Sequence, residues 1–165
     1  MNLNKAEVLP FLRSLRAAGH RVTPQRLALF AELRAAADHP SAETLFRRVR
    51  RRHPTVSRAS VYKTLHLLSA LGLAVPLEGA DGVTRYDGRS SPHVNAVCVR
   101  CGAVVDLATD VGRLLPQLAR ASGFLLERHL TVRGLCPQCR KAGQAQSKEV
   151  QHGRARPFRR RGGRR

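Results

Sequence analysis

The sequence lacks any apolar run near the ~20 residues that a membrane-spanning helix needs. Its opening segment carries Glu7 where a signal peptide would have an unbroken apolar stretch. These absences exclude an integral membrane protein and predict a cytoplasmic chain with no membrane partner. A length of 165 residues excludes a large multidomain enzyme, and hydrophobic and charged contents of 42 % and 25 % are typical of a chain that folds around a core.

Acidic residues are also scarce, since 11 Asp and Glu stand against 30 Lys and Arg and give a net charge of +19. The excess is uneven, at +9 over residues 1–75, +2 over residues 76–140 and +8 over residues 141–165. Two basic segments around a nearly neutral one indicate a polyanionic partner, because Lys and Arg displace the counterions of phosphate groups. Nucleic acid is the leading candidate. A general bias toward arginine would raise the total charge but would not explain its distribution.

Cysteine is limited to two C-x-x-C pairs, with 34 residues between the pairs and no cysteine left over: Cys98, Cys101, Cys136 and Cys139. Four thiolates are the ligand set of a closed, tetrahedral structural zinc site. Disulfides are disfavoured in a reducing cytoplasm. The alternative is a redox-active dithiol, which a single C-x-x-C pair can form. The doubled pattern predicts one structural Zn²⁺ per chain.

The first half of the chain has the pattern of helices. Thr23 followed by a proline indicates a helix N-terminus, and this helix is expected to reach about residue 37. Ser41 caps a second helix, over residues 42–52, whose apolar positions recur at helical spacing while arginines occupy the rest of its circumference. A third helix is expected over residues 58–71, with Gly72 as its C-cap.

Two short strands, over residues 73–77 and 83–87, follow with an Asp-Gly step between them that favours a hairpin. Three helices and a hairpin make a winged helix-turn-helix, whose third helix enters the DNA major groove. One face of that helix carries the side chains expected to contact base edges and phosphates: Arg58, Tyr62, Lys63 and His66. The arginines of the second helix would contact the DNA backbone. The alternative is a solvated polar face with no ligand.

From residue 93 the pattern changes to strands, expected over 93–99, 103–107 and 124–132, with a helix over 110–122. A nearly neutral α/β segment with a zinc site, next to a basic DNA-binding module, is typical of a dimerisation domain, because helix-turn-helix proteins commonly bind DNA as two-fold dimers. The prediction is an α+β fold in three parts: a winged-helix DNA-binding domain (1–86), a small α/β dimerisation and metal-binding domain (87–140) and a disordered basic tail (141–165).

Seven spaced motifs resemble, in order, those of the ferric uptake regulator (Fur) family of metal-dependent repressors. They are Gly19-x-Arg21-x-Thr23-x-Gln25-Arg26, His39-Pro40-x-Ala42, Ser60-Val61-Tyr62-x-Thr64-Leu65, Gly72-Leu73, Arg85-Tyr86, His93-x-Asn95-x-x-Cys98-x-x-Cys101-Gly102 and Gly134-x-Cys136-x-x-Cys139. The resemblance implies a homodimer that holds structural zinc and binds double-stranded DNA at A/T-rich inverted repeats. Tyr62 matches the base-contacting tyrosine of the family, and Arg21 falls where a basic residue reaches the minor groove.

The resemblance also implies a regulatory metal site, at positions occupied here by His39, Asp87, His93, Asn95 and Asp106. Most members have histidine where Asn95 stands, so this chain is expected to bind the metal more weakly. Nitrogen and oxygen donors suit Fe²⁺ or Mn²⁺ and, less selectively, Zn²⁺. A further family site near residues 92, 94 and 128 lacks its ligands, with His129 one position out of register.

Aspartate at position 106, where iron-uptake regulators usually have glutamate, resembles the peroxide-sensing branch of the family, PerR. The predicted function is a DNA-binding repressor, not an enzyme, that senses peroxide through Fe(II)-catalysed histidine oxidation. One alternative is an iron or manganese homeostasis regulator that senses metal occupancy. A distant alternative is a C-x-x-C thiol oxidoreductase.

Overall fold

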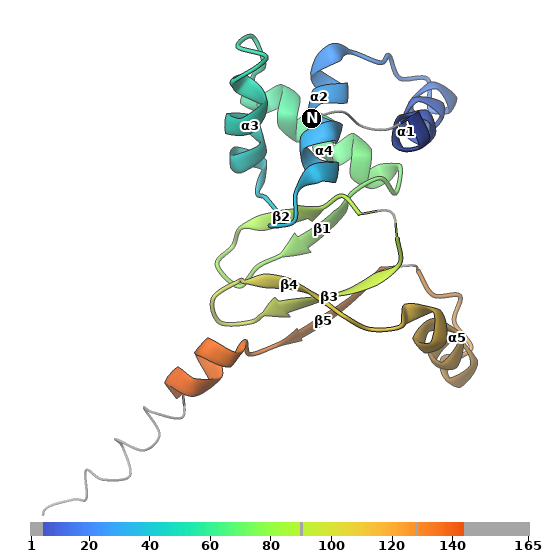
Figure 1. Cartoon of the computed structure of the whole chain (residues 1–165), viewed down its shortest axis with the longest axis vertical. Coiled ribbons are helices and arrows are strands. Elements are labelled where there is room, and N and C mark those ends of the chain that lie inside the picture. The colour runs from blue at the N-terminus through green and yellow to red at the C-terminus, as the bar shows by residue number, and fades with distance from the viewer. Residues whose placement is uncertain (1–4, 90, 128, 144–165) are drawn as a thin grey trace, which may run out of the picture.

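The computed structural model describes residues 5–89, 91–127 and 129–143 of the chain. The described elements form two units stacked end to end (Figure 1). The helical unit contains four helices and a two-stranded hairpin, and the sheet unit contains a three-stranded sheet, one helix and a short helical segment over residues 137–143. The structure confirms the predicted α+β fold class.

The helical unit consists of α1 (Lys5–Ala17), α2 (Pro24–Ala35), α3 (Ala42–Arg50) and α4 (Arg58–Ala70). The last three confirm the predicted helices, although each ends one or two residues early. The side chains of Thr23, Ser41 and Ser57 accept hydrogen bonds from backbone N–H groups of the first turns of α2, α3 and α4, at 3.3, 3.2 and 3.1 Å. These caps satisfy donors that have no partner inside a helix, which is why the helices begin there.

Helix α1 was not predicted from the sequence, and Pro10 stands inside it, where it removes a backbone donor. Packing compensates for this loss. Phe11 and Leu15 are fully buried, and the Phe11 ring stacks on Phe30 of α2 with centroids 4.4 Å apart. The tertiary contacts of one apolar face therefore maintain a helix that local propensity disfavours.

The main core lies in the helical unit, between α1, α2, α3 and α4. The apolar faces predicted for α3 and α4 are buried in it, including Leu45, Phe46, Val61 and Leu65. Gly72 follows α4 with a φ of +67°, a left-handed conformation that glycine adopts without steric cost. Gly72 therefore ends the helix as expected, although it lies one residue after the C-cap, Leu71.

The hairpin pairs β1 (Val75–Glu78) with β2 (Thr84–Asp87) in antiparallel register. The segment between α2 and α3 runs beside β2, where the Tyr86 N–H donates to the Pro40 carbonyl at 3.0 Å and Ser41 forms an isolated bridge with Arg85. This pairing brings the loop before α3 to the end of the hairpin that faces the sheet unit.

The sheet unit has the strand order β4 (Val104–Leu107), β3 (His93–Cys98), β5 (His129–Gly134), with β5 parallel to β3 and β4 antiparallel to it. Helix α5 (Val111–Ser122) connects β4 to β5 at one side of the sheet (Figure 1). Because β4 runs antiparallel to β3, it ends where β3 begins; the connection through α5 passes β3 at that end, and β5 therefore runs parallel to β3.

The predicted strand over residues 124–132 is wrong at its start, because β5 begins only at His129. Gly123 ends α5 in the left-handed conformation, and Phe124 and Leu125 are 71 % and 101 % exposed. Their apolar character resembled a strand, but they pair with no strand among the described residues.

The predicted tail begins too early, because residues 141–143 belong to a helical segment. The rest of the predicted tail, residues 144–165, lies outside the described residues. Within the described ranges, no helix combines the length and hydropathy of a membrane span.

Candidate metal centres and nucleic-acid interface

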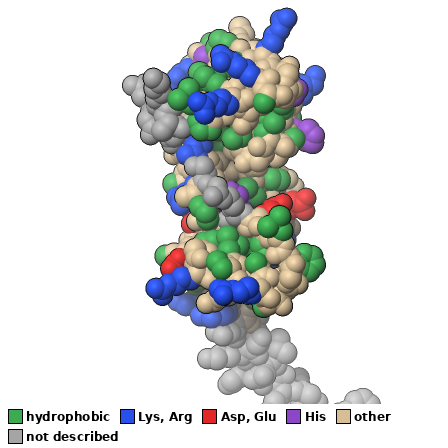
Figure 2. Space-filling view, turned by 90° about the vertical axis from the view of Figure 1, so that its right-hand side faces the viewer, with side chains coloured by type: hydrophobic (Ala, Val, Ile, Leu, Met, Phe, Trp, Pro, Cys, Tyr) green, Lys and Arg blue, Asp and Glu red, His purple; other side chains and the backbone are tan. Residues whose placement is uncertain are grey.

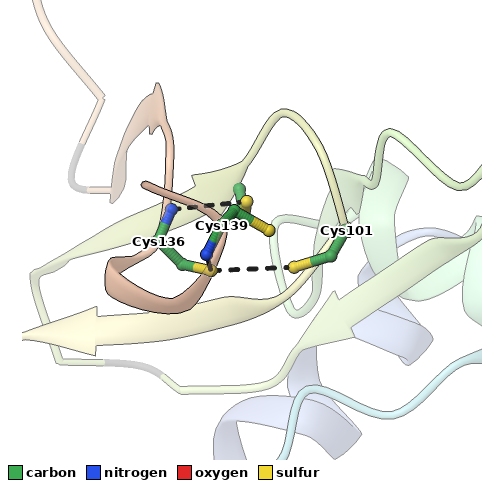
Figure 3. A group of neighbouring side chains, drawn as sticks. Cys101, Cys136 and Cys139 are labelled. Atoms are coloured by element: carbon green, nitrogen blue, oxygen red, sulfur yellow. Dashed lines mark hydrogen bonds between the residues drawn. The ribbon is translucent and has the colours of Figure 1, made fainter. Parts of the chain in front are cut away.

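The four cysteines meet at one end of the sheet unit. Cys98 ends β3, Cys101 lies in the turn to β4, and Cys136 and Cys139 follow β5, so that two distant segments face each other (Figure 3). All four Sγ atoms lie within 4.8 Å of one another, and those of Cys101 and Cys136 are 3.8 Å apart, too far for a disulfide. Gly102, with a φ of +71°, makes the turn that aims the first pair inward.

The surroundings shift the pKa values of two of these thiols in opposite directions. Hydrogen bonds from the N–H groups of Cys136, Cys101 and Arg100 lower the pKa of Cys98 to about 6. The hydrogen bond with Cys136 and partial burial raise the pKa of Cys139 to about 12. Four sulfur donors this close together fit tetrahedral Zn²⁺, which binds cysteine as the thiolate. The low-pKa thiol of Cys98 is buried, which does not favour a redox-active dithiol.

A second cluster lies between the two units. The structure brings together all five residues that the resemblance assigned to a regulatory metal: His39 before α3, Asp87 at the end of β2, His93 and Asn95 on β3, and Asp106 on β4. All but Asp106 are buried. Because two segments of the helical unit and two strands of the sheet unit contribute, the cluster bridges the two units.

Short polar contacts link the imidazoles and carboxylates of this cluster. His93 Nε2 is 2.6 Å from Asp87 Oδ2 and 3.7 Å from Asp106 Oδ1, and His39 Nε2 is 3.0 Å from the same Asp106 oxygen. Ligands about 2.1 Å from an ion lie roughly 3.0–3.4 Å from one another. The separations of 3.0 and 3.7 Å are near this range, whereas the 2.6 Å contact is that of a hydrogen bond, so His93 and Asp87 would move slightly apart to share one divalent cation.

The backbone holds two of these imidazoles in place. His39 has a φ of +47°, a left-handed conformation that is costly for a residue with a side chain. The Nδ1 of His93 donates to the Ser91 carbonyl at 2.8 Å, which leaves the Nε2 lone pair facing Asp87. A lone pair so close to a carboxylate needs a proton or a metal ion between them, and this arrangement of imidazole and carbonyl is common among metal-binding histidines.

Hydrogen bonds keep Asp87 charged despite its burial. Burial by itself would raise the pKa of Asp87, but donation from the Arg89 N–H, from the Asn95 amide and from His93 lowers the pKa overall. Asp106 in turn pairs with the Arg89 guanidinium at 2.6 Å. The site thus presents ionised carboxylate beside imidazole, which suits a divalent metal of intermediate softness.

Comparison with known proteins tests the family relationship, and residues 17–132 match the model of the ferric uptake regulator family. The chain belongs to the ferric uptake regulator family. It is 33 % identical to the peroxide operon regulator of Bacillus subtilis over 137 residues, which cover 82 % of this chain and 94 % of that one. It is 38 % identical to the transcriptional regulator FurA of Mycobacterium tuberculosis over 133 residues, 78 % of this chain and 89 % of that one.

Among solved structures, the Campylobacter jejuni peroxide stress regulator aligns with a TM-score of 0.60 at 26 % identity, covering 83 % of this chain and 100 % of that one. These relatives are named as regulators and not as enzymes. The chain is accordingly a Fur-family transcriptional regulator with a four-cysteine cluster and an Asp/His cluster that can hold metal ions.

In this Fur-family chain, the surface expected to bind DNA is the exposed face of α4. Tyr62 is 53 % exposed, and Lys63 and His66 are exposed beside it. The three side chains line a hollow of about 460 Å³ between α4 and the hairpin, together with Ser69, Pro76 and Tyr86. Lys and Arg side chains appear over the helical unit in Figure 2. Arg21 is exposed in the segment before α2.

Arg58 is engaged within the protein. Its Nε and Nη2 donate to the two carboxylate oxygens of Glu43 at 2.9 and 3.0 Å, and its guanidinium lies 4.7 Å from the centroid of the Phe46 ring. This pairing lowers the pKa of the Glu43 carboxyl. Arg58 therefore links α4 to α3, and its charge is partly balanced before any DNA arrives.

Sequence reasoning missed two residues near the metal cluster, Arg89 and His129. Arg89 pairs with Asp106, a contact that no spacing rule indicates. One donor atom of His129 lies within 4.8 Å of one donor atom each of Asp87 and His93. The sequence showed His129 only as a residue out of register for another site, because the face on which it lies depends on where β5 pairs with β3.

Proposed function

We propose that this protein is a metal-dependent, DNA-binding repressor that senses peroxide. Residues 1–86 would bind DNA and contribute His39 to the regulatory metal, and residues 87–140 would hold the structural zinc, the other regulatory ligands and the dimer contacts. The observation that carries the proposal is the cluster between the units, in which His39 of the helical unit lies 3.0 Å from Asp106 of the sheet unit.

The position of the cluster supports a switch based on the relative arrangement of the two units. With a metal bound, His39 and Asp106 are held at one point, and the helical unit has a defined orientation. A metal that binds this arrangement better than others shifts the population toward it by the difference in affinity. DNA binding then depends on occupancy, because two recognition helices must fit half-sites of fixed spacing.

A dimer is supported by the exposed hydrophobic side chains of the sheet unit. Large apolar side chains remain exposed along β4, α5, β5 and their flanks: Val99, Val105, Leu107, Leu118, Phe124, Leu125, Val132 and Leu135. Hydrophobic side chains are visible on this unit in Figure 2. Apolar surface of this extent is typical of an interface, and a second copy of the chain would cover it with two-fold symmetry.

Peroxide sensing is supported by the names of the relatives in Bacillus subtilis and Campylobacter jejuni and by aspartate at both carboxylate positions. Fe(II) supplies the reduction of peroxide and the oxidation of nearby imidazole, whereas Mn(II) does not carry out this chemistry readily. His39 and His93 are the imidazoles placed to be oxidised. Oxidation of either one removes a donor that holds the two units together.

The test is mass spectrometry of tryptic peptides after peroxide treatment of the Fe²⁺ and Mn²⁺ forms, with operator binding measured in parallel. We expect added oxygen on His39 and His93 in the Fe²⁺ form only, together with release of DNA. His66, exposed on α4 and outside the cluster, is the internal control and should stay unmodified.

Unmodified His39 and His93 in protein that nevertheless releases DNA through metal loss would refute peroxide sensing. That outcome would favour a regulator of iron or manganese homeostasis, which the same donor set could also serve. Operator binding that is independent of any divalent metal would refute both versions.

A further inference from the structure

Asn95 stands where most members of the family have a histidine, so the cluster between the units has one imidazole fewer at this position. Its Nδ2 donates to Asp87 Oδ2 at 3.0 Å and lies 3.2 Å from His93 Nε2, so the amide N–H₂ faces the centre. An amide N–H₂ donates hydrogen bonds and does not bind a metal. Its Oδ1 is buried and has no hydrogen-bond partner among the residues that the structure describes. Asn95 therefore positions Asp87 and His93 and supplies no electron pair in this arrangement.

A third imidazole stands on the neighbouring strand. β5 runs parallel to β3 with His129 directly opposite His93, so the two side chains lie on the same face of the sheet. Their rings meet edge to face, with centroids 5.3 Å apart at an interplanar angle of 74°. One donor atom each from Asp87, His93 and His129 fits within 4.8 Å. His129 is thus within reach of the ion that Asp87 and His93 would bind.

The register of β5 determines this placement. Neighbouring residues on a strand point to opposite faces, so a histidine one position earlier would be directed away from His93. At position 129 the imidazole shares a face with His93 and Asn95, whose own alternation places both toward Asp87. His129 is therefore one position away from the further family site, but it lies on the face of β5 that also carries the regulatory cluster.

We infer that His129 is a ligand of the regulatory metal and replaces the imidazole that Asn95 does not supply. The inference rests on the proposed function, since it assumes that the cluster holds a divalent cation. The completed donor set has three imidazoles and two carboxylates: His39, Asp87, His93, Asp106 and His129. These nitrogen and oxygen donors suit Mn²⁺, Fe²⁺ or Zn²⁺. Because two ligands of one ion lie roughly 3.0–3.4 Å apart, binding draws His129 inward from its present distance.

The experiment uses the full-length protein with its structural zinc in place, titrated with Mn²⁺ against a chelating dye. We expect His129→Ala to weaken the Mn²⁺ affinity by at least about tenfold, since even loss of a group that only supports a ligand costs about 10–100-fold. Thr131→Ala is the matched control, because Thr131 is exposed two residues further along the same face of β5. It should change the affinity by less than about twofold, with zinc content and circular dichroism unchanged in both variants.

Pulsed electron paramagnetic resonance of the Mn²⁺ form counts coordinated imidazoles without any variant. Three coordinated imidazoles in the wild type, falling to two in His129→Ala, support the inference. Two in the wild type, or an unchanged affinity in His129→Ala, overturn it. If the wild type binds no Mn²⁺ beyond its structural metal, or if His39→Ala binds it equally well, the proposed function itself fails.

Discussion

At the scale of single residues, the exposed face of α4 combines a polar aromatic side chain with one cation that is already paired. Tyr62 projects from the helix beside the hollow against the hairpin, whereas Arg58 is held by Glu43 and Phe46. We therefore expect Tyr62 to contact bases and Arg58 to orient α4 and add charge. The two roles predict different responses to substitution.

Tyr62→Ala should weaken binding to a specific operator by about 1–3 kcal/mol, the range for one lost base contact, and should weaken binding to random DNA much less. Fluorescence anisotropy with both DNAs measures the difference. Gln117→Ala, an exposed change on α5, is the control and should alter neither affinity. Equal losses on both DNAs for Tyr62→Ala would show that this face does not read bases.

Glu43→Gln should strengthen binding to specific and random DNA alike, because it removes a negative charge beside α4 and releases Arg58 to contact phosphate. The slope of log K against log salt should steepen by about one unit, the change expected for one additional phosphate contact. Glu127→Gln makes the same change of net charge on the exposed surface of the sheet unit. If both variants gain the same DNA affinity, net charge alone explains the effect and Arg58 has no local role.

At the scale of elements, the turn of the hairpin touches the cysteine cluster. Asp81 in that turn pairs with Arg85 at 2.8 Å, and a Cβ on Gly102 would lie 2.6 Å from the Asp81 carboxylate. The hydrogen bond from Arg85, with a second from the Val83 N–H, lowers the pKa of Asp81 to about 2. Because this folded-state value is below the ordinary 3.8, the pair stabilises the fold above about pH 4, and this stabilisation is lost as the pH falls toward 2.

Gly102→Ala should destabilise the sheet unit more than Gly123→Ala does. Both glycines have left-handed φ values, +71° and +72°, so both variants incur the cost of about 1–2 kcal/mol for a side chain there. Only at position 102 does the new Cβ meet Asp81, while nothing lies within 4 Å at position 123. Urea unfolding of both variants, with and without Asp81→Ala, gives the comparison. An equal cost at both sites in the presence of Asp81 would contradict the contact.

At the scale of the whole molecule, the two candidate metal centres connect different parts of the chain. The cysteine cluster ties the segment after β5 to the turn between β3 and β4, both within the sheet unit (Figure 3). The Asp/His cluster joins the sheet unit to the helical unit. Loss of the first should therefore disrupt the sheet unit itself, and loss of the second should alter only the arrangement of the units.

Cys136→Ser should abolish zinc binding and yield monomeric or aggregated protein, because the binding free energy of a structural zinc site is also folding free energy. Sedimentation velocity and metal analysis check this expectation. His39→Ala, which removes a donor of the other cluster, should keep one zinc and remain dimeric. A stable dimer of Cys136→Ser without zinc would refute the structural role.

Deleting residues 144–165 should weaken binding to specific and random DNA alike and flatten the salt dependence, because this segment is strongly basic. The same anisotropy titrations at several salt concentrations provide the measurement. A loss confined to the operator would show instead that the segment reads sequence.

Local chemistry made the helices, the caps and the cysteine centre predictable from the sequence. Hydroxyl side chains at Thr23 and Ser41, glycine at position 72 and two C-x-x-C pairs act over a few residues, and the structure places each as expected. Helix α1 and the start of β5 were not predictable in this way. Packing of Phe11 on Phe30 maintains α1 despite Pro10, and the pairing with β3 determines where β5 begins.

The sequence by itself determined the basic charge distribution, the family resemblance and five candidate ligands of a regulatory metal. Only the tertiary structure decided that those five meet between two units, that the Asn95 amide turns its N–H₂ to the centre, and that His129 lies on the same face. The physical reason is strand register: a shift of one residue reverses the face of every side chain on β5, and register depends on partners far away in the chain.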